Sequence, residues 1–420
     1  MKLVQILKKP LRIVKRQISN SHVRRAYEES VAHYDNVISS IKAKGKKQLD
    51  FAAFVVFESC YGISDLFDRM LENPKWNPKV VIIPDVSRGI EHQKKSYDKA
   101  KQYFINKYGS DKVIDGWNEN SNEYYDIADN FDMIYFANPY DGMVHRHHSI
   151  EYASKKNVLP IYISYGYDIC TATTQARFRS IALNVVWKCF ADTVFSYDDF
   201  KKYMINKGEN VYLVGYSKMD SYHQYNMSPK KRKKILISPH HTIKMDYLPL
   251  SNFLRFYNLI LKLPEMFPDI DFVFRPHPLL FTNLINLAGW KQSDVDEYLE
   301  KLKKNNIEYS SGGDYLQLFA ECDAIINDCG SYTVEWLFTG KPGCFVYSPE
   351  LRPELLTKLM NESISQYNIA KSEDDIINFV KQVEQAESKN SYEVSDWVKE
   401  NIMINYPDVT SAILKEINIL

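Results

Sequence analysis

Polar residues that can bind an anion follow three apolar runs in the second half of this 420-residue chain. The runs occur in "ISPHHTIK", "FRPHP" and "NDCGSYTVEW", and the residues that follow them are His240 and His241, then Arg275 and His277, then Asp328, Gly330 and Ser331. Arginine pairs with phosphate oxygens through parallel N–H groups, and histidine donates a hydrogen bond or a proton near neutral pH. One such histidine alone is more often structural, but three polar strand ends in one domain predict a ligand site.

The third of these segments lies within "AIINDCGSYTVEWLFTGKP", in which an apolar strand leads through Gly330 and Ser331 into a helix predicted to begin near Tyr332. The free N–H groups of the first helical turn, with the Ser331 hydroxyl, form an anion site that suits a diphosphate. Tyr332 and Thr333 complete this predicted donor-binding turn. Glu335 either reaches a ribose or caps the helix, and Ser331 is also explained as an ordinary N-cap.

Several kinds of chemistry are not indicated. The chain has no Walker motif and no GxGxxG, so neither an ATPase nor a dinucleotide oxidoreductase is predicted. The six cysteines are scattered and form no CxxC pair, which favours reduced thiols in the cytoplasm over disulfides or zinc. No basic patch with interleaved aromatic residues points to nucleic acid outside the N-terminus. We predict no metal and no cofactor.

The elements that must position these residues are strands of two parallel sheets. Continuous apolar runs, expected when helices cover both faces of a sheet, occur at 51–59, 80–86, 133–141, 158–166, 193–197 and 211–216, and again at 235–241, 271–278, 324–331 and 343–348. Ligands bind beyond the carboxyl ends of such strands. We therefore predict an α/β chain with a helical extension (1–48), two Rossmann-like domains (49–225 and 226–395) and a C-terminal helix (396–420).

The first 27 residues are basic. They contain no acidic residue, and their eight basic residues are Lys2, Lys8, Lys9, Arg12, Lys15, Arg16, Arg24 and Arg25. With apolar residues at near-helical spacing, the segment either lies on an anionic membrane surface or packs as a surface helix on its own domain. No apolar run is long enough to span a bilayer and no signal-peptide pattern occurs, so a cytoplasmic, peripherally membrane-associated protein is predicted.

The motifs of the second half resemble the C-terminal half of the CDP-glycerol glycerophosphotransferase family, which builds teichoic acids and related capsules. The shared order is a strand ending in Pro-His, a strand ending in His-Pro, a D-Y-x-x-L helix, an apolar strand, an Asp-x-x-Ser turn and an acidic helix leading to Lys-Pro. The matching residues are His277 after Arg275, then Asp314 and Tyr315, then Asp328, Ser331 and Glu335. The resemblance covers about residues 234–348 and is weak in the first half.

This resemblance implies the GT-B arrangement of two facing Rossmann-like domains, with the nucleotide diphosphate on the C-terminal domain and the acceptor in the cleft. It also implies that His277 and Ser331 hold the pyrophosphate and that Glu335 lies on the ribose side. Many members carry Trp-His-Gly-Thr in the first domain, with the histidine as candidate base. Here the equivalent stretch is "YISYGYDI", with Tyr165 in place of that histidine.

The sequence therefore leaves several candidates for the residue that activates the acceptor. The candidates are His240, His241, Asp168 and one residue of the cluster "DGMVHRHH". The cluster is also explained as the solvated start of a helix. A base must come within hydrogen-bond reach of the hydroxyl that it deprotonates. We list His277, His240 and His241 as catalytic candidates, and as acceptor-side candidates Asp141, His145, Tyr165, Gly166 and Asp168.

The resemblance implies an enzyme that transfers glycerol or ribitol phosphate from a CDP-linked donor to a hydroxyl of a surface polysaccharide or its lipid-linked precursor. Two alternatives stay open. One is a GT-B glycosyltransferase that uses a nucleotide sugar in capsule or O-antigen synthesis. The other is an inactive nucleotide-binding scaffold of a capsule-assembly complex, which the absence of the first-domain histidine would favour.

Overall fold

The structure, a computed structural model, describes residues 2–225, 232–312, 315–387 and 391–420, without the side chains of residues 2–19 and Asp141. The chain forms two compact units. Unit 1 comprises Met1–Gly166, Gln175–Asp220 and Ile404–Leu420, and unit 2 comprises Tyr167–Thr174 and Ser221–Met403. Neither unit is continuous in sequence, which differs from the contiguous division expected above.

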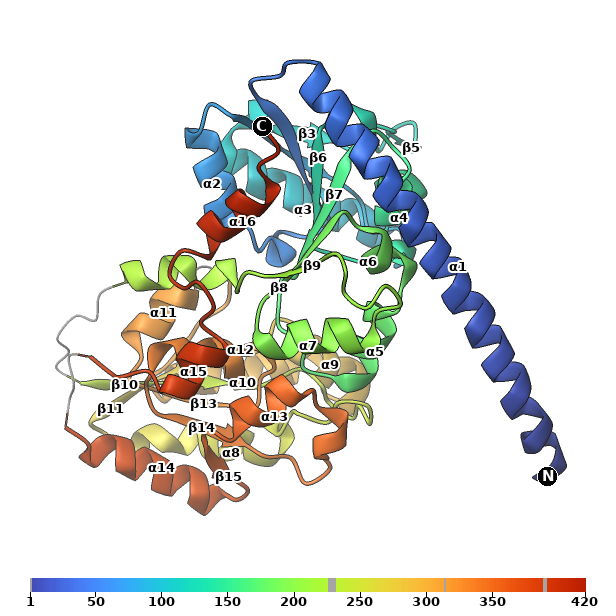
Figure 1. Cartoon of the computed structure of the whole chain (residues 1–420). Helices are drawn as coiled ribbons and strands as arrows, with labels where there is room; N and C mark the ends of the chain where they lie inside the picture. The colour runs from blue at the N-terminus through green and yellow to red at the C-terminus, as the bar shows by residue number, and fades with distance from the viewer. Residues whose placement is uncertain (1, 226–231, 313–314, 388–390) are drawn as a thin grey trace. The chain divides into compact units, whose positions relative to one another are not determined.

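Unit 1 is built on a seven-stranded parallel sheet with the order β3-β2-β1-β6-β7-β8-β9. The strands are β1 (Leu49–Val55), β2 (Trp76–Ile82), β3 (Val113–Asp115), β6 (Met133–Phe136), β7 (Leu159–Ile163), β8 (Lys188–Ala191) and β9 (Val211–Leu213), and a small antiparallel pair is formed by β4 (Trp117–Asn118) and β5 (Glu123–Tyr124). Every residue of β6 and β7 is buried. Helices lie on both faces of this sheet (Figure 1), which explains the continuous apolar runs.

The helices of unit 1 include a 42-residue N-terminal helix. They are α1 (Lys2–Ala43), α2 (Ser64–Glu72), α3 (Ile90–Tyr108), α4 (Ile150–Ala153), α5 (Thr171–Phe178, whose first turn belongs to unit 2), α6 (Ile181–Val185), α7 (Val194–Tyr203) and α16 (Val409–Ile417). The second half of α1 buries Tyr34, Val37 and Ile41 in the core of the unit, and its first half extends beyond that core (Figure 1). The Asp220 carboxylate accepts the first N–H groups of α16, which ties the C-terminal helix to unit 1.

One predicted strand is wrong. The segment 193–197 begins helix α7, and the neighbouring strand is β8, which ends at Ala191. Thr193 accepts a hydrogen bond from the Ser196 backbone N–H, and the Ser196 hydroxyl accepts one from the Thr193 N–H. This reciprocal capping box stabilises a helix start and overrides the β-branched and aromatic composition of the segment.

Unit 2 contains a six-stranded parallel sheet with the order β12-β11-β10-β13-β14-β15. The strands are β10 (Lys233–Ser238), β11 (Ile270–Phe274), β12 (Ile307–Tyr309), β13 (Ala324–Asn327), β14 (Gly343–Val346) and β15 (Asn368–Ala370). The helices are α8 (Phe253–Met266), α9 (Leu280–Ala288), α10 (Gln292–Lys304), α11 (Tyr315–Glu321), α12 (Ser331–Glu335), α13 (Lys358–Ile364), α14 (Glu373–Gln385) and α15 (Asp396–Asn401).

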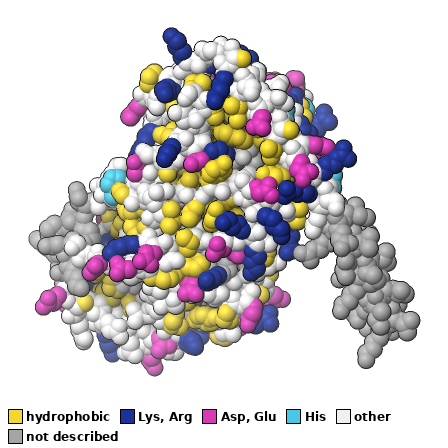
Figure 2. Space-filling view, viewed as in Figure 1, with side chains coloured by type: hydrophobic (Ala, Val, Ile, Leu, Met, Phe, Trp, Pro, Cys, Tyr) yellow, Lys and Arg dark blue, Asp and Glu magenta, His cyan; other side chains and the backbone are white. Residues whose placement is uncertain are grey.

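The predicted fold class is confirmed, since both units are α/β with a parallel sheet. In each sheet the strand order reverses beside the first strand of the unit, β1 or β10, which is the topology of a doubly wound fold. On the face shown in Figure 2, basic and acidic side chains are intermixed, as the zero formal net charge leads one to expect.

Candidate functional site

Two neighbouring strands of unit 2, β10 and β11, bring the predicted histidines together. Strand β10 lies between β11 and β13, so the residues after their carboxyl ends share one edge of the sheet. The ring centroids of His240 and His241 are 4.4 Å apart, those of His241 and His277 are 4.0 Å apart, and those of His240 and His277 are 5.3 Å apart. We call these three residues the histidine cluster.

The histidine cluster is electrically neutral at physiological pH. Burial lowers the pKa of His277 to about 3, and the nearby His241 lowers it further. Burial also lowers the pKa of His241 and, more strongly, that of His240. One ring nitrogen from each residue lies within 4.8 Å of the others, a spacing that either a metal ion or a small anion can bridge.

Arg275 is held inside unit 2. Its Nη1 donates to the Ser310 hydroxyl and the Gly312 carbonyl, each at 2.7 Å, and its Nε lies 3.3 Å from the Tyr332 hydroxyl. Only 9% of the residue is exposed. Arg275 therefore fixes Tyr332 and the loop after β12, whereas the sequence had suggested a guanidinium that faces a ligand.

Asp328 positions the loop that carries the histidines. Its Oδ1 accepts the His240 backbone N–H at 2.6 Å, and its Oδ2 accepts the backbone N–H of Asn252 at 2.5 Å and the Asn252 side-chain amide at 3.3 Å. Burial raises the pKa of Asp328 to about 7, against the effect of these hydrogen bonds. Asp328 therefore joins the ends of β10 and β13 and acts on the site through His240.

The turn after β13 differs from the predicted one. Helix α12 begins at Ser331, and Gly330 is its N-cap, with no side-chain cap, so Ser331 is not the capping residue. A Cβ added at Gly330 would lie 2.4 Å from Ile169 Cδ1, so an alanine there would require the end of the Ile169 side chain to shift. Thr333 and Glu335 are buried, with Thr333 donating to Asn327 Oδ1, while Ser331 and Tyr332 remain partly exposed.

A segment from the first half of the chain belongs to unit 2. The Thr357 hydroxyl donates to the Asp168 carbonyl at 2.7 Å, and the Thr357 N–H donates to the Ile169 carbonyl at 3.1 Å. These bonds place Asp168 in unit 2, next to the residue that contacts Gly330. Tyr165 and Gly166 belong to unit 1, where the Tyr216 hydroxyl donates to the Tyr165 carbonyl.

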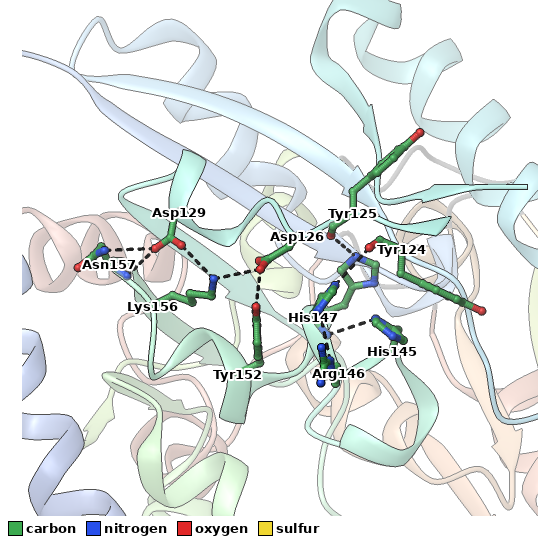
Figure 3. A network of polar contacts seen from close by, with 11 residues as sticks. Tyr124, Tyr125, Asp126, Asp129, His145, Arg146, His147, Tyr152, Lys156 and Asn157 are labelled. Carbon is green, nitrogen blue, oxygen red and sulfur yellow. Dashed lines mark hydrogen bonds and ion pairs between the residues drawn. The ribbon is translucent and has the colours of Figure 1, made fainter. Parts of the chain in front are cut away.

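The acceptor-side histidines lie in a polar network of unit 1 (Figure 3). The His145 ring stacks on Tyr124 with a centroid distance of 4.2 Å, and His147 Nδ1 is 3.2 Å from the Tyr124 carbonyl. His148 is buried with Nε2 3.1 Å from the Tyr125 carbonyl, and burial lowers its pKa to about 4. These contacts favour a structural role for the cluster. Side-chain contacts of Asp141 and the whole of Asp314 lie outside the described residues.

The sequence reasoning did not identify Asp85 and His92. Asp85 follows β2 and its carboxylate is buried, with Oδ1 accepting from the Ser87 N–H and hydroxyl. Its Oδ2 lies 3.3 Å from Arg88 Nε and 3.6 Å from His92 Nε2. The signal was available, because Asp85 is the polar residue within the predicted run 80–86 and comes shortly after β2 ends at Ile82, the pattern that drew attention to unit 2.

No family model matches the sequence, and a search of curated proteins finds no match. Solved structures do match. One is a UDP-N-acetylglucosamine 2-epimerase, with 13% identity and a TM-score of 0.56 over 88% of this chain and 95% of that chain. Another is the wall teichoic acid polymerase TagF soaked with CDPG, with 12% identity and a TM-score of 0.56 over 95% of this chain and 97% of that chain.

A third is the UDP-GlcNAc 2-epimerase of Methanocaldococcus jannaschii in complex with UDP-GlcNAc and UDP. It has 13% identity and a TM-score of 0.53 over 88% of this chain and 99% of that chain. At these identities the likeness concerns the fold alone. The chain therefore has the two-unit, Rossmann-like α/β fold of the GT-B type.

Proposed function

We propose that this protein is a transferase that moves glycerol or ribitol phosphate from a CDP-linked donor to a hydroxyl of a surface polysaccharide or its lipid-linked precursor. The observation that carries the proposal is the convergence of three histidines and the start of α12 at one edge of the unit 2 sheet. The order of motifs and the likeness to TagF, which was soaked with CDPG, support a CDP-linked donor.

In the proposed reaction the acceptor oxygen attacks the β-phosphorus of the donor. The new P–O bond forms as the bond to the bridging oxygen breaks, and the electron pair leaves with CMP. The protein's main task is to hold the phosphates and to stabilise developing negative charge with N–H donors. His277, His241 and Ser331 are the proposed donors, with Arg275 and Asp328 positioning their neighbours.

Asp168 is our candidate for the base that takes the acceptor proton. It belongs to unit 2, its side chain is partly exposed, and its neighbour Ile169 contacts Gly330. Asp168→Asn is expected to reduce transfer at least 100-fold while leaving the affinity for CDP unchanged. Equal losses of CDP binding and transfer would instead assign Asp168 to donor binding.

The test of the function is product analysis with the purified full chain. It is incubated with CDP-glycerol, CDP-ribitol, UDP-sugars and CMP-sugars, with a lipid-linked glycan as acceptor. We expect CMP release that depends on a CDP-polyol, and its absence from both CDP-polyols would refute the proposal. Release of UDP from a UDP-sugar would support the glycosyltransferase alternative, which the UDP-bound epimerase favours. Binding of CDP with no turnover of any donor would support the scaffold alternative.

We also propose that the start of α1 binds an anionic membrane. Arg24 is paired with Glu28 and Glu209, and Arg25 with Glu29, so these two basic residues of the predicted segment are engaged within unit 1. The proposed contact therefore rests on the six basic residues before Asn20. No helix among the described residues has the length and apolar character needed to cross a bilayer.

Sedimentation with vesicles tests this contact. Deleting residues 2–19 is expected to abolish co-sedimentation with phosphatidylglycerol vesicles, and neutral phosphatidylcholine vesicles serve as the control. Unchanged binding of the shortened chain would rule out this segment as the membrane contact.

A further inference from the structure

We propose that the start of α3 in unit 1 binds a neutral, hydroxyl-rich ligand, a sugar or a polyol, through His92 Nδ1 and the Arg88 guanidinium. Four side chains make this site, which we call the α3 subsite: Phe57, Asp85, Arg88 and His92. The identity of the ligand as the acceptor of the transfer reaction rests on the proposed function, whereas the binding of hydroxyl groups does not.

The α3 subsite lies where two neighbouring strands end. Strands β1 and β2 pair in parallel, so their carboxyl ends share one edge of the unit 1 sheet. Phe57 follows β1, Asp85 and Arg88 lie between β2 and α3, and His92 is in the first turn of α3. Ligands of parallel α/β sheets bind beyond this edge.

Asp85 is fixed in one orientation. Its side chain is fully buried, and Oδ1 accepts the Ser87 backbone N–H at 2.8 Å and the Ser87 hydroxyl at 2.6 Å. Oδ2 has no hydrogen-bond partner among the described residues. It lies 3.3 Å from Arg88 Nε and 3.6 Å from His92 Nε2. The buried carboxylate therefore acts on both side chains through its charge.

The carboxylate decides which nitrogen of His92 carries the proton. Nε2 is buried and faces Asp85 Oδ2, which can only accept, so a lone pair on Nε2 would meet the lone pairs of the carboxylate. The neutral ring therefore carries its proton on Nε2, and Nδ1 presents its lone pair. The side chain is 38% exposed, and no group of the described chain hydrogen-bonds to Nδ1, which is not a buried atom. Nδ1 is thus an accessible acceptor.

Arg88 supplies hydrogen-bond donors beside this acceptor. Its guanidinium carbon lies 5.7 Å from the centre of the Phe57 ring, and its side chain is 54% exposed. The Phe57 ring also meets the His92 ring edge to face, with centroids 6.2 Å apart. One aromatic ring thus contacts both an N–H donor and a nitrogen acceptor. Neighbouring hydroxyls of one ligand can bond to both, because a hydroxyl both donates and accepts.

The charges of the subsite favour a neutral ligand. Asp85 balances the charge of Arg88, and Glu58, the residue after Phe57, is paired with Lys99. Among these four charged residues no positive charge is left to offset a phosphate, and Asp85 repels one. A sugar or polyol carries hydroxyls without charge, and its C–H groups can lie on the partly exposed Phe57 ring.

Nitrogen-15 NMR of the full chain tests how Asp85 orients His92. At pH 8 the wild type is expected to show a protonated Nε2 and an unprotonated Nδ1. In Asp85→Asn the amide oxygen keeps the place of Oδ1, because the Ser87 N–H can only donate to it, and the NH₂ group then faces Nε2. The proton is therefore expected to move to Nδ1. An unchanged tautomer in this variant, or a protonated Nδ1 in the wild type, would overturn the proposal.

Saturation-transfer NMR measures binding, with glycerol, ribitol, glucose and N-acetylglucosamine as neutral probes and glycerol 3-phosphate and inorganic phosphate as anionic ones. The wild type is expected to bind at least one neutral probe. His92→Phe, which keeps a ring against Phe57, and Arg88→Met should each weaken that binding about 5- to 10-fold, since one hydrogen bond is lost. His22→Phe, at an exposed position of α1, is the control and should have no effect.

Three results of this measurement would overturn the subsite. One is the absence of binding by every neutral probe. The second is binding of the phosphate compounds alone, which would show an anion site. The third is equal affinity of the wild type and His92→Phe for a probe, which would place that probe elsewhere.

The subsite and the proposed function fail separately. With the lipid-linked glycan as acceptor, His92→Phe is expected to raise the KM for the acceptor about 5- to 10-fold and to leave kcat and CDP affinity within about twofold, because the lost hydrogen bond contributes to binding alone. CMP release with an unchanged acceptor KM would reject the subsite and keep the function. Sugar binding that His92→Phe weakens, in a protein that turns over no CDP-polyol, would keep the subsite and reject the function.

Discussion

Lys341 is expected to stabilise unit 2 from inside, although it belongs to the Lys-Pro motif of the family resemblance. The residue is 6% exposed, and its Nζ donates to the carbonyl oxygens of Phe319, Ala320 and Cys322 at 2.7, 2.8 and 2.7 Å. These carbonyls end helix α11, where a positive charge is favourable. The helix in turn carries Tyr315, whose ring stacks on Tyr332 beside the site.

Lys341→Met keeps the aliphatic stem and removes the ammonium. Each of the three hydrogen bonds from the charged donor contributes about 1.5 kcal/mol to the stability of the fold. Removing the ammonium also removes the cost of burying its charge, which offsets part of this contribution. The net loss of stability is therefore roughly 3 kcal/mol. The loss should be local, because it falls on the last turn of α11. A change of 3 kcal/mol corresponds to about 100-fold faster amide exchange in that turn.

Hydrogen exchange followed by mass spectrometry measures this change in peptides that cover 315–322. Lys262→Met, at an exposed position of α8, is the matched control and is expected to leave exchange unaltered. Exchange in α11 equal to that of the control would refute the reasoning. Loss of CDP affinity with unchanged exchange would instead place Lys341 at the ligand.

Other predictions concern packing and pH. Gly330→Ala displaces the end of the Ile169 side chain and is expected to cost about 1 kcal/mol, the low end for overpacking. The melting temperature should fall in Gly330→Ala and stay unchanged in Gly142→Ala, where a Cβ meets nothing within 4 Å. Combining Gly330→Ala with Ile169→Ala should cost less than the sum of the two separate costs, and additive costs would contradict the contact. Burial raises the pKa of Asp328 to about 7, so its contribution to stability is full below about pH 4 and is lost as the pH rises through about 7. Urea unfolding midpoints at pH 5 and pH 8 should therefore change less in Asp328→Asn than in the wild type, and equal changes would contradict the assignment. Burial lowers the pKa of His148 to about 4, so its contribution is present above about pH 6.5 and is lost as the pH falls through about 4. His148→Gln, which can still donate to the Tyr125 carbonyl, should unfold less readily in acid than the wild type, and an unaltered acid transition would count against burial as the cause.

Local pattern was sufficient for the framework of the site. Continuous apolar runs indicated strands buried on both faces, and the polar residues directly after them lie at the carboxyl ends of β10, β11 and β13. Both features follow from the residues of one strand and its flanks. Asp85 lies within the predicted run 80–86, so it is found only when the strand is ended at Ile82. The capping box at Thr193 could not be read from the usual Ser/Thr-x-x-Glu/Gln signature, because its fourth residue is Ser196.

Long-range packing decided the roles of individual side chains. Arg275 is engaged by Tyr332, 57 residues away, and Asp328 holds His240, 88 residues away. Ile169 joins unit 2 from the first half of the chain and fills the space in front of Gly330. No local pattern can reveal such partners, because the chain must fold before they meet.

The sequence alone predicted that the polar residues after these strands lie at the carboxyl edge of one sheet, since strand ends are local features. The strand order that makes β10 and β11 neighbours, and so brings the three histidines together, is a long-range property. Only the tertiary structure decided what they can bind. The Leu279 N–H donates to His277 Nδ1, and Asn283 and Thr242 lie against Nδ1 of His241 and of His240. These contacts depend on how α9 and the loop after β10 pack. The spacing of the three rings permits either a metal ion or an anion.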